Sequence, residues 1–103
     1  MGVTEPPFSY DLSVDERTLT LRGDLDEGAS VQLRELLSGV AERGTDLRID
    51  LNDVDFLPSS AVGVLAAARG AVSRAGGSLT FVAAPGTIAQ RVLTICSLPF
   101  DER

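Results

Sequence analysis

The stretch LRIDLNDVDFLPSSAVGVLAAA, from Leu47 to Ala68, decides the fold of this chain. In its first half, apolar Leu47, Ile49 and Leu51 alternate with other residues, which is typical of a strand with a buried face. Two adjacent serines then follow Pro58, and the second half is rich in small apolar residues. The stretch therefore predicts a buried strand, a short turn and a helix that begins at the serines.

Ser59 and Ser60 fall at the predicted start of this helix, and two interpretations of them stay open. Serine is a preferred N-cap residue, and Pro58 before the pair fixes the path of the chain into the helix. A helix N-terminus is also a place where backbone N–H groups and the helix dipole stabilise a phosphate. Such a phosphate would change the charge of a docking surface around it. Physics alone favours the cap.

A helical projection of the predicted helix, from Ser60 to about Ala75, separates a buried side from the rest. The buried side consists of Ala61, Val64, Leu65, Ala68 and Val72. The residues Val62, Gly63, Ala66 and Ala67 fall outside it, so the first two turns are expected to expose small and apolar side chains. That surface is either covered by a neighbouring element or a docking face for a partner, and both alternatives remain open.

The flanking patterns predict a mixed sheet. Alternation at Phe8, Tyr10 and Leu12, and again at Leu19 and Leu21, predicts a half-buried hairpin around the polar SVDER turn. Helical spacing over 28–43 predicts a helix that ends at Gly44. The segment SLTFVA at 78–83 predicts another strand. A last helix is expected to begin near Gly86, with Ile88, Val92 and Ile95 on one side. The order strand, strand, helix, strand, helix, strand, helix predicts an α/β fold. Its mixed, mostly parallel sheet carries an N-terminal antiparallel hairpin and helices packed on it.

Composition restricts the function. A chain of 103 residues is one domain, with a flexible N-terminus at 1–7 and the folded domain at 8–103. The net charge of −6 disfavours binding to nucleic acid or to an anionic membrane, and no run is long enough for membrane insertion. The absence of His removes the usual hydrolase and zinc machinery, so we expect no enzyme, metal or cofactor. A lone Cys96, expected to be buried, and no signal peptide predict a cytoplasmic protein.

Three stretches resemble the STAS domain of bacterial anti-sigma factor antagonists. Gly23-Asp24-Leu25-Asp26 is similar to the family's G-E-L-D turn, and 47–56 is similar to its D-L-x-x-V-x-F strand. The segment 58–65, PSSAVGVL, is similar to its D-S-S-G-L-G-V-L signature. The resemblance runs from about Tyr10 to Leu98 and implies the STAS fold for nearly the whole chain.

The resemblance also implies a mechanism. In the family, a kinase-type, ATP-binding anti-sigma factor binds the unphosphorylated domain and releases a sigma factor, and it phosphorylates the second serine, here Ser60. Asp24 and Asp26 are expected either to favour the start of the first helix or to face the serine turn. The predicted partner-binding residues are Asp24, Asp26, Ser59, Ser60, Val62, Gly63 and Ala66.

Two residues depart from the family pattern. Pro58 stands where the family has Asp, and Ala61 stands where it has Gly. We expect Pro58 to lower the rate of phosphorylation more than the affinity for the partner, because it stiffens the turn and removes a carboxylate. A STAS subunit of an ABC-type membrane transport assembly, acting as a non-catalytic interaction domain, is the alternative function.

Overall fold

Strands and helices follow one another in the predicted order in the computed structural model, which describes residues 8–102. The expectation of a flexible segment at 1–7 lies outside the described residues. The elements are β1 (Phe8–Ser13), β2 (Thr18–Asp24), α1 (Glu27–Arg43), β3 (Leu47–Phe56), α2 (Ser59–Arg74), β4 (Leu79–Val82) and α3 (Ile88–Ile95).

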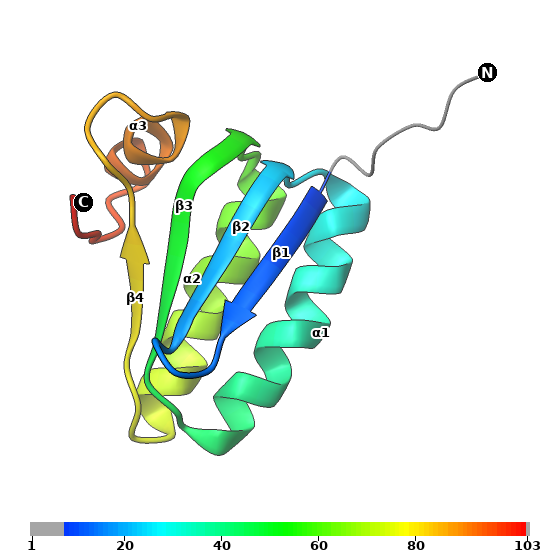
Figure 1. Ribbon diagram of the computed structural model, residues 1–103, viewed down its shortest axis with the longest axis vertical. Coiled ribbons are helices and arrows are strands. Elements are labelled where there is room, and N and C mark those ends of the chain that lie inside the picture. Colours follow the sequence, from blue (N-terminus) through cyan, green and yellow to red (C-terminus); the bar gives the residue numbers. More distant parts are fainter. Residues whose placement is uncertain (1–7, 103) are drawn as a thin grey trace.

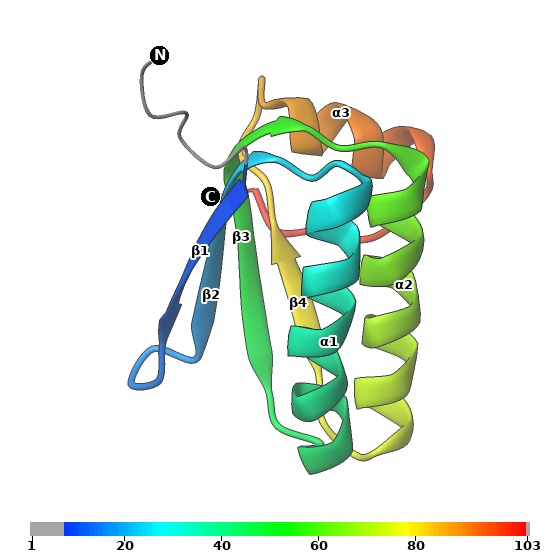
Figure 2. The ribbon, with the colours of Figure 1, turned by 90° about the vertical axis from the view of Figure 1, so that its right-hand side faces the viewer.

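The four strands form one sheet in the order β1-β2-β3-β4. β1 and β2 are antiparallel, whereas β2, β3 and β4 run parallel to one another. Helices α1 and α2 lie side by side over one face of the sheet, and α3 lies at the end where β3 finishes and α2 begins (Figures 1 and 2). The predicted mixed, mostly parallel sheet with its hairpin and packed helices is confirmed.

The core lies between this sheet and the two long helices. Leu19, Leu21, Ile49 and Leu51 are buried on the inner face of the sheet, as their alternation requires. The helices contribute the residues predicted for their inner sides, including Leu33 and Leu37 of α1 and Ala61, Leu65 and Val72 of α2. Gly44 ends α1 in a left-handed conformation, as expected of a C-cap glycine.

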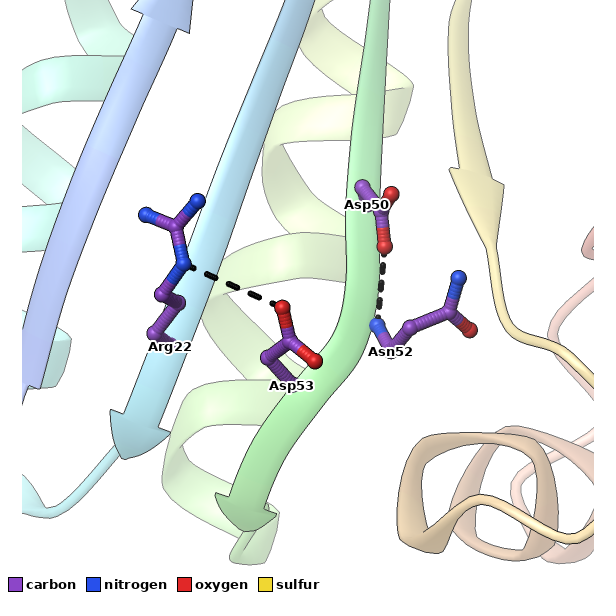
Figure 3. A network of polar contacts seen from close by, with 4 residues as sticks. All are labelled: Arg22, Asp50, Asn52 and Asp53. Atoms are coloured by element: carbon purple, nitrogen blue, oxygen red, sulfur yellow. Dashed lines mark hydrogen bonds and ion pairs between the residues drawn. The ribbon is translucent and has the colours of Figure 1, made fainter.

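Beyond residue 50, β3 departs from simple alternation. Thr20 pairs with Asp50 but Arg22 pairs with Asp53, so β3 carries one extra residue at this point. The side chain of Asp50 accepts a hydrogen bond from the Asn52 backbone N–H at 2.9 Å, and Arg22 Nε lies 3.8 Å from Asp53 Oδ2 (Figure 3). The bulge returns Val54 to the core, which carries β3 on to the serine turn.

Three expectations about exposure are wrong. Tyr10 and Leu12 share the inner face with Leu21 and Leu19, their partners on β2, but are 50% and 44% exposed. Alternation correctly identified their face, but it could not show that the edge of the sheet is left uncovered. Cys96 is exposed rather than buried, because it is the C-cap of α3, where the chain leaves the core.

Helix α3 packs near β3 through a narrow contact. Its buried residues are Ala89 and Leu93, one turn apart. The side that carries Ile88 and Ile95 faces outward instead. Figure 2 shows α3 at the end of the molecule where α2 begins, and the exposed Ile88 and Ile95 therefore add apolar surface to that end.

Candidate functional site

The candidate site is the edge of the domain at which α2 begins. Pro58 occupies the N-cap position with an extended backbone, φ −76° and ψ 168°, and no side chain caps the helix. The first helical hydrogen bond runs from the Val62 N–H to the Pro58 carbonyl at 3.0 Å. The N–H groups of residues 59–61 therefore precede the hydrogen bonding of the helix and point toward its open end.

The prediction that Ser59 caps α2 is wrong. Ser59 and Ser60 are the first two residues of the helix itself, and both are exposed. A cap hydroxyl must stand one position earlier, in extended backbone, to reach the free N–H groups. Since Pro58 fills that position, both serine hydroxyls are left at the surface.

The exposed surface at the start of α2 is narrower than the projection predicted. Ser59, Ser60, Gly63 and Ala67 are exposed and Ala66 is half-buried. These four exposed residues form one strip along the helix, here called the serine ridge. Its spacing of three to four residues keeps it on a single face.

Val62 does not belong to this ridge, and its expected exposure is wrong. Its side chain is only 8% exposed and is part of the core. Val62 lies on the same side of α2 as Arg69, which lines a hollow together with Leu79 and Thr80 of β4. A helical projection identifies the side that faces the sheet, but it cannot show which neighbouring positions are covered as well.

A shallow apolar hollow of about 220 Å³ borders the ridge, between α1 and α2. Ala67 and Ala71 line it from α2, and Arg34 and Ser38 line it from α1. Because the residues on the α2 side are small, the backbone of the helix lies near the surface. A partner can therefore approach the start of α2 closely.

The two aspartates of the 23–26 turn reach the same edge. The Leu25 N–H donates to the Phe56 carbonyl at 2.9 Å, which ties the end of β2 to the end of β3. Asp26 is the N-cap of α1, and its Oδ1 accepts from the Ala29 N–H at 2.9 Å. The expectation that Asp26 favours the start of the first helix is thus confirmed. Asp24 pairs with Phe56 and is half-buried.

Comparison with known proteins identifies the family. The family model described as "Mlab, STAS domain" matches residues 8–96. This chain belongs to the STAS domain family. The anti-sigma-B factor antagonist of Bacillus subtilis (strain 168) is 39% identical to it over 74 residues, which make up 70% of this chain and 68% of that protein.

Solved structures support the STAS fold. An anti-sigma factor antagonist from Mycobacterium paratuberculosis superposes with a TM-score of 0.77 at 20% identity, covering 98% of this chain and 92% of that one. The phosphorylated form of the Bacillus cell fate determinant SpoIIAA gives a TM-score of 0.66 at 23% identity, covering 88% and 84%. At these identities the likeness concerns the fold.

The serine edge of this STAS domain is acidic. Asp24, Asp26 and Glu27 lie where β2 passes into α1, and the exposed Asp55 lies near the end of β3. This concentration of carboxylates agrees with the net charge of −6.

Phe56 is a surface residue of this edge that sequence reasoning missed. Gly23 pairs with Val54, but Asp24 pairs with Phe56, so a second irregularity in β3 lies at Asp55. It turns Phe56 outward, and the ring is 50% exposed. Simple alternation from Val54 would have buried Phe56, and nothing in the sequence pattern alone signals the second irregularity.

None of the three helices within residues 8–102 of this STAS chain combines the length and the apolar character that a membrane crossing requires.

Proposed function

We propose that this STAS protein is an anti-sigma factor antagonist that binds a kinase-type, ATP-binding anti-sigma factor through the serine ridge, with Ser60 as the phosphorylated residue. The observation that carries the proposal is an exposed Ser60 in the first turn of α2, in a chain 39% identical to an anti-sigma-B factor antagonist. Binding of the unmodified form would release a sigma factor, and phosphorylation would end that binding.

Gly63 supports a docking role for the ridge. Glycine inside a helix costs about 0.5–1 kcal/mol of stability relative to alanine. A Cβ added at Gly63 would meet no heavy atom within 4 Å, so packing within the chain does not require glycine there. A partner that approaches the helix backbone closely is a physical reason for this residue.

The acidic edge supports a charge switch. A phosphate on Ser60 would be stabilised in the free protein by the N–H groups at the start of α2. In the complex, the same phosphate would be desolvated beside Asp24 and the other carboxylates. The modification would therefore favour the free protein over the complex.

Substitution of Gly63 is the first test of this interface. We expect Gly63→Ala to raise the free energy of unfolding by about 0.5–1 kcal/mol, because alanine is the better helix former. The same substitution should weaken binding of the cognate anti-sigma factor in isothermal titration, and Gly63→Arg should weaken it more than tenfold.

Gly70→Ala is the matched control in the same helix. A Cβ there would meet only the flexible end of Arg74, at 3.3 Å, so a similar gain in stability is expected. Its affinity for the partner should stay within twofold of wild type. Equal affinities for Gly63→Ala, Gly63→Arg and wild type would show that the serine ridge is not part of the interface.

Pro58 is expected to control the rate of the switch. Phosphoryl transfer depends on the alignment of the Ser60 hydroxyl with the γ-phosphate, and positioning supplies most of the catalysis. Pro58→Asp should raise the phosphorylation rate, measured with purified partner and Mg-ATP. Affinity for the unmodified form should change little, because the ridge is untouched. An unchanged rate, or a rate gain matched by an equal gain in affinity, would show that Pro58 does not act on the switch.

The identity of the partner distinguishes the proposed function from the alternative, a subunit of an ABC-type transport assembly. Affinity capture from the native host, followed by mass spectrometry, should recover an ATP-binding anti-sigma factor. Recovery of a permease and its ATPase, with no anti-sigma factor, would favour the alternative.

A further inference from the structure

The two edges of the sheet differ in how they are protected. On the β4 side, the Ala83 N–H donates to the Asp101 carbonyl and the Asp101 N–H donates to the Phe81 carbonyl, both at 2.8 Å. On the other side, within residues 8–102, β1 forms strand hydrogen bonds only with β2. The outer edge of β1 therefore presents N–H and C=O groups that another strand can pair with.

Edge strands usually carry features that prevent such pairing, and β1 lacks most of them. Lysine, arginine, proline and bulges commonly protect an edge. The sequence of β1 is FSYDLS, which contains none of these residues and only one charge, Asp11. Its pairing with β2 runs from Phe8 to Ser13 without a bulge.

Exposed apolar side chains accompany this free edge. Tyr10 and Leu12 are about half exposed, and Val14, just beyond the strand, is 78% exposed. An apolar hollow of about 310 Å³ continues from Leu12 and Val14 toward Val40 at the end of α1. Burial of this surface would remove apolar area from water, which is a favourable contribution to association.

We propose that β1 pairs antiparallel with β1 of a second copy of this chain, across a two-fold axis that is perpendicular to the sheet and passes midway between Tyr10 and Tyr10 of the second copy. Such an axis keeps the helix-covered faces of both copies on the same side. Residues that oppose each other must then point to the same face. The result is one continuous sheet through both copies.

The register centred on Tyr10 fits a second copy well. Tyr10 then lies opposite Tyr10 of the second copy, and Leu12 lies opposite its Phe8, so apolar side chains meet apolar side chains. Asp11 lies opposite Ser9 of the second copy, and no like charges face each other. A register centred on Asp11 would instead place two carboxylates together, and one centred on Ser9 would place Leu12 opposite position 6, outside β1 as described.

Charge sets the expected strength of this dimer. Each copy carries a net charge of −6, so long-range repulsion opposes association. Salt screens such repulsion between exposed charges. The dimer should therefore be weak at low ionic strength and should tighten as salt is added.

Sedimentation equilibrium tests the proposal directly. We expect reversible dimerisation of the wild-type chain between about 10 µM and 1 mM, the range suited to small interfaces. Tyr10→Glu places two carboxylates opposite each other at the axis and should remain monomeric. Val31→Glu, a change at an exposed apolar residue of α1, should dimerise like wild type.

A cross-linking experiment tests the register. In a Cys96→Ser background, Tyr10→Cys places two thiols opposite each other across the axis and should give a disulfide-linked dimer under mild oxidation. Ser9→Cys, on the adjacent residue of the same edge, lies opposite Asp11 of the second copy and should cross-link far less. Matching thermal midpoints would confirm that both variants are folded.

Three results would overturn the proposal: a wild-type chain that stays monomeric over the whole range, dimerisation that survives Tyr10→Glu, or equal cross-linking of the two cysteine variants. If the first of these results is found and Tyr10→Glu also loses anti-sigma factor binding, the edge belongs to that partner instead. None of these results depends on whether Ser60 is phosphorylated.

Discussion

Phosphorylation of Ser60 is expected to weaken binding of the anti-sigma factor by about 100-fold or more, corresponding to roughly 3 kcal/mol for a charge buried without a partner. The hydroxyl stands on the exposed ridge in the first turn of α2. In the free protein the added charge faces water and the N–H groups of residues 59–61. In the complex it would lose that water beside the acidic edge. Titration of the phosphoprotein and the unmodified protein against the same partner measures the difference.

The control variants separate this effect from general repulsion. Ser60→Ala removes the hydroxyl and should bind like wild type while accepting no phosphate. Ser73→Glu adds a charge to an exposed position near the end of the same helix and should change the affinity less than twofold. Phosphate found by peptide mass spectrometry on Ser59 or Thr87, or an affinity unchanged by phosphate on Ser60, would contradict the assignment.

The fold could be predicted from the sequence because its strongest signals are local and agree with one another. The spacing of Leu33, Leu37 and Val40 marks one face of α1, and Gly44 marks its end. The alternation of Leu47, Ile49 and Leu51 marks the inner face of β3. Since the intervening helices require parallel crossovers, the order of these elements restricted the sheet to very few arrangements.

The errors concern what covers a surface, which is a property of distant parts of the chain. Val62 looks exposed on a projection of α2 alone, but its side chain is buried and belongs to the core. Tyr10 and Leu12 carry the alternation of a buried face, but no neighbour covers the edge on which they lie. Local periodicity determines the direction of a side chain, whereas its burial depends on packing that the pattern does not encode.

The candidate site was predicted in part for the same reason. Both serines were correctly placed at the start of α2, because the apolar pattern of the helix begins there. The cap role of Ser59 was wrong, because the choice between Pro58 and Ser59 as N-cap depends on a shift of one residue in backbone conformation. Sequence signals locate helix ends only to within one or two residues.

A large loss of stability is expected for Gly77→Ala, although Gly77 has no positive φ that would by itself require glycine. A Cβ at Gly77 would lie 2.4 Å from the Gly44 carbonyl oxygen and 2.7 Å from its carbon. A Cβ at Gly44 would in turn lie 2.4 Å from the Ala75 carbonyl oxygen. The two glycines therefore allow the turn after α1 and the turn after α2 to approach each other through backbone atoms.

Neither turn can move away without losing further contacts. The Gly44 N–H caps α1 through the Ala41 carbonyl, and the Leu47 N–H donates to the Ser78 carbonyl at 2.9 Å. The Ser78 N–H donates to Asp46 Oδ1 at 2.9 Å. Overpacking against such a framework typically costs 1–3 kcal/mol, and we expect about 3 kcal/mol here because both contacts are backbone. That is a large share of the ~5–15 kcal/mol that stabilises a domain.

Gly76→Ala is the informative comparison. Gly76 requires glycine for its backbone conformation, whereas Gly77 requires it because there is no space for a Cβ. Gly76 has a positive φ of 93°, but a Cβ there would meet no heavy atom within 4 Å. Its substitution should cost only the strain of a left-handed residue, about 1–2 kcal/mol. Urea unfolding should therefore rank Gly77→Ala as more destabilising than Gly76→Ala. The reverse order would show that the two turns can separate, and that backbone strain rather than their close approach fixes this end of the domain.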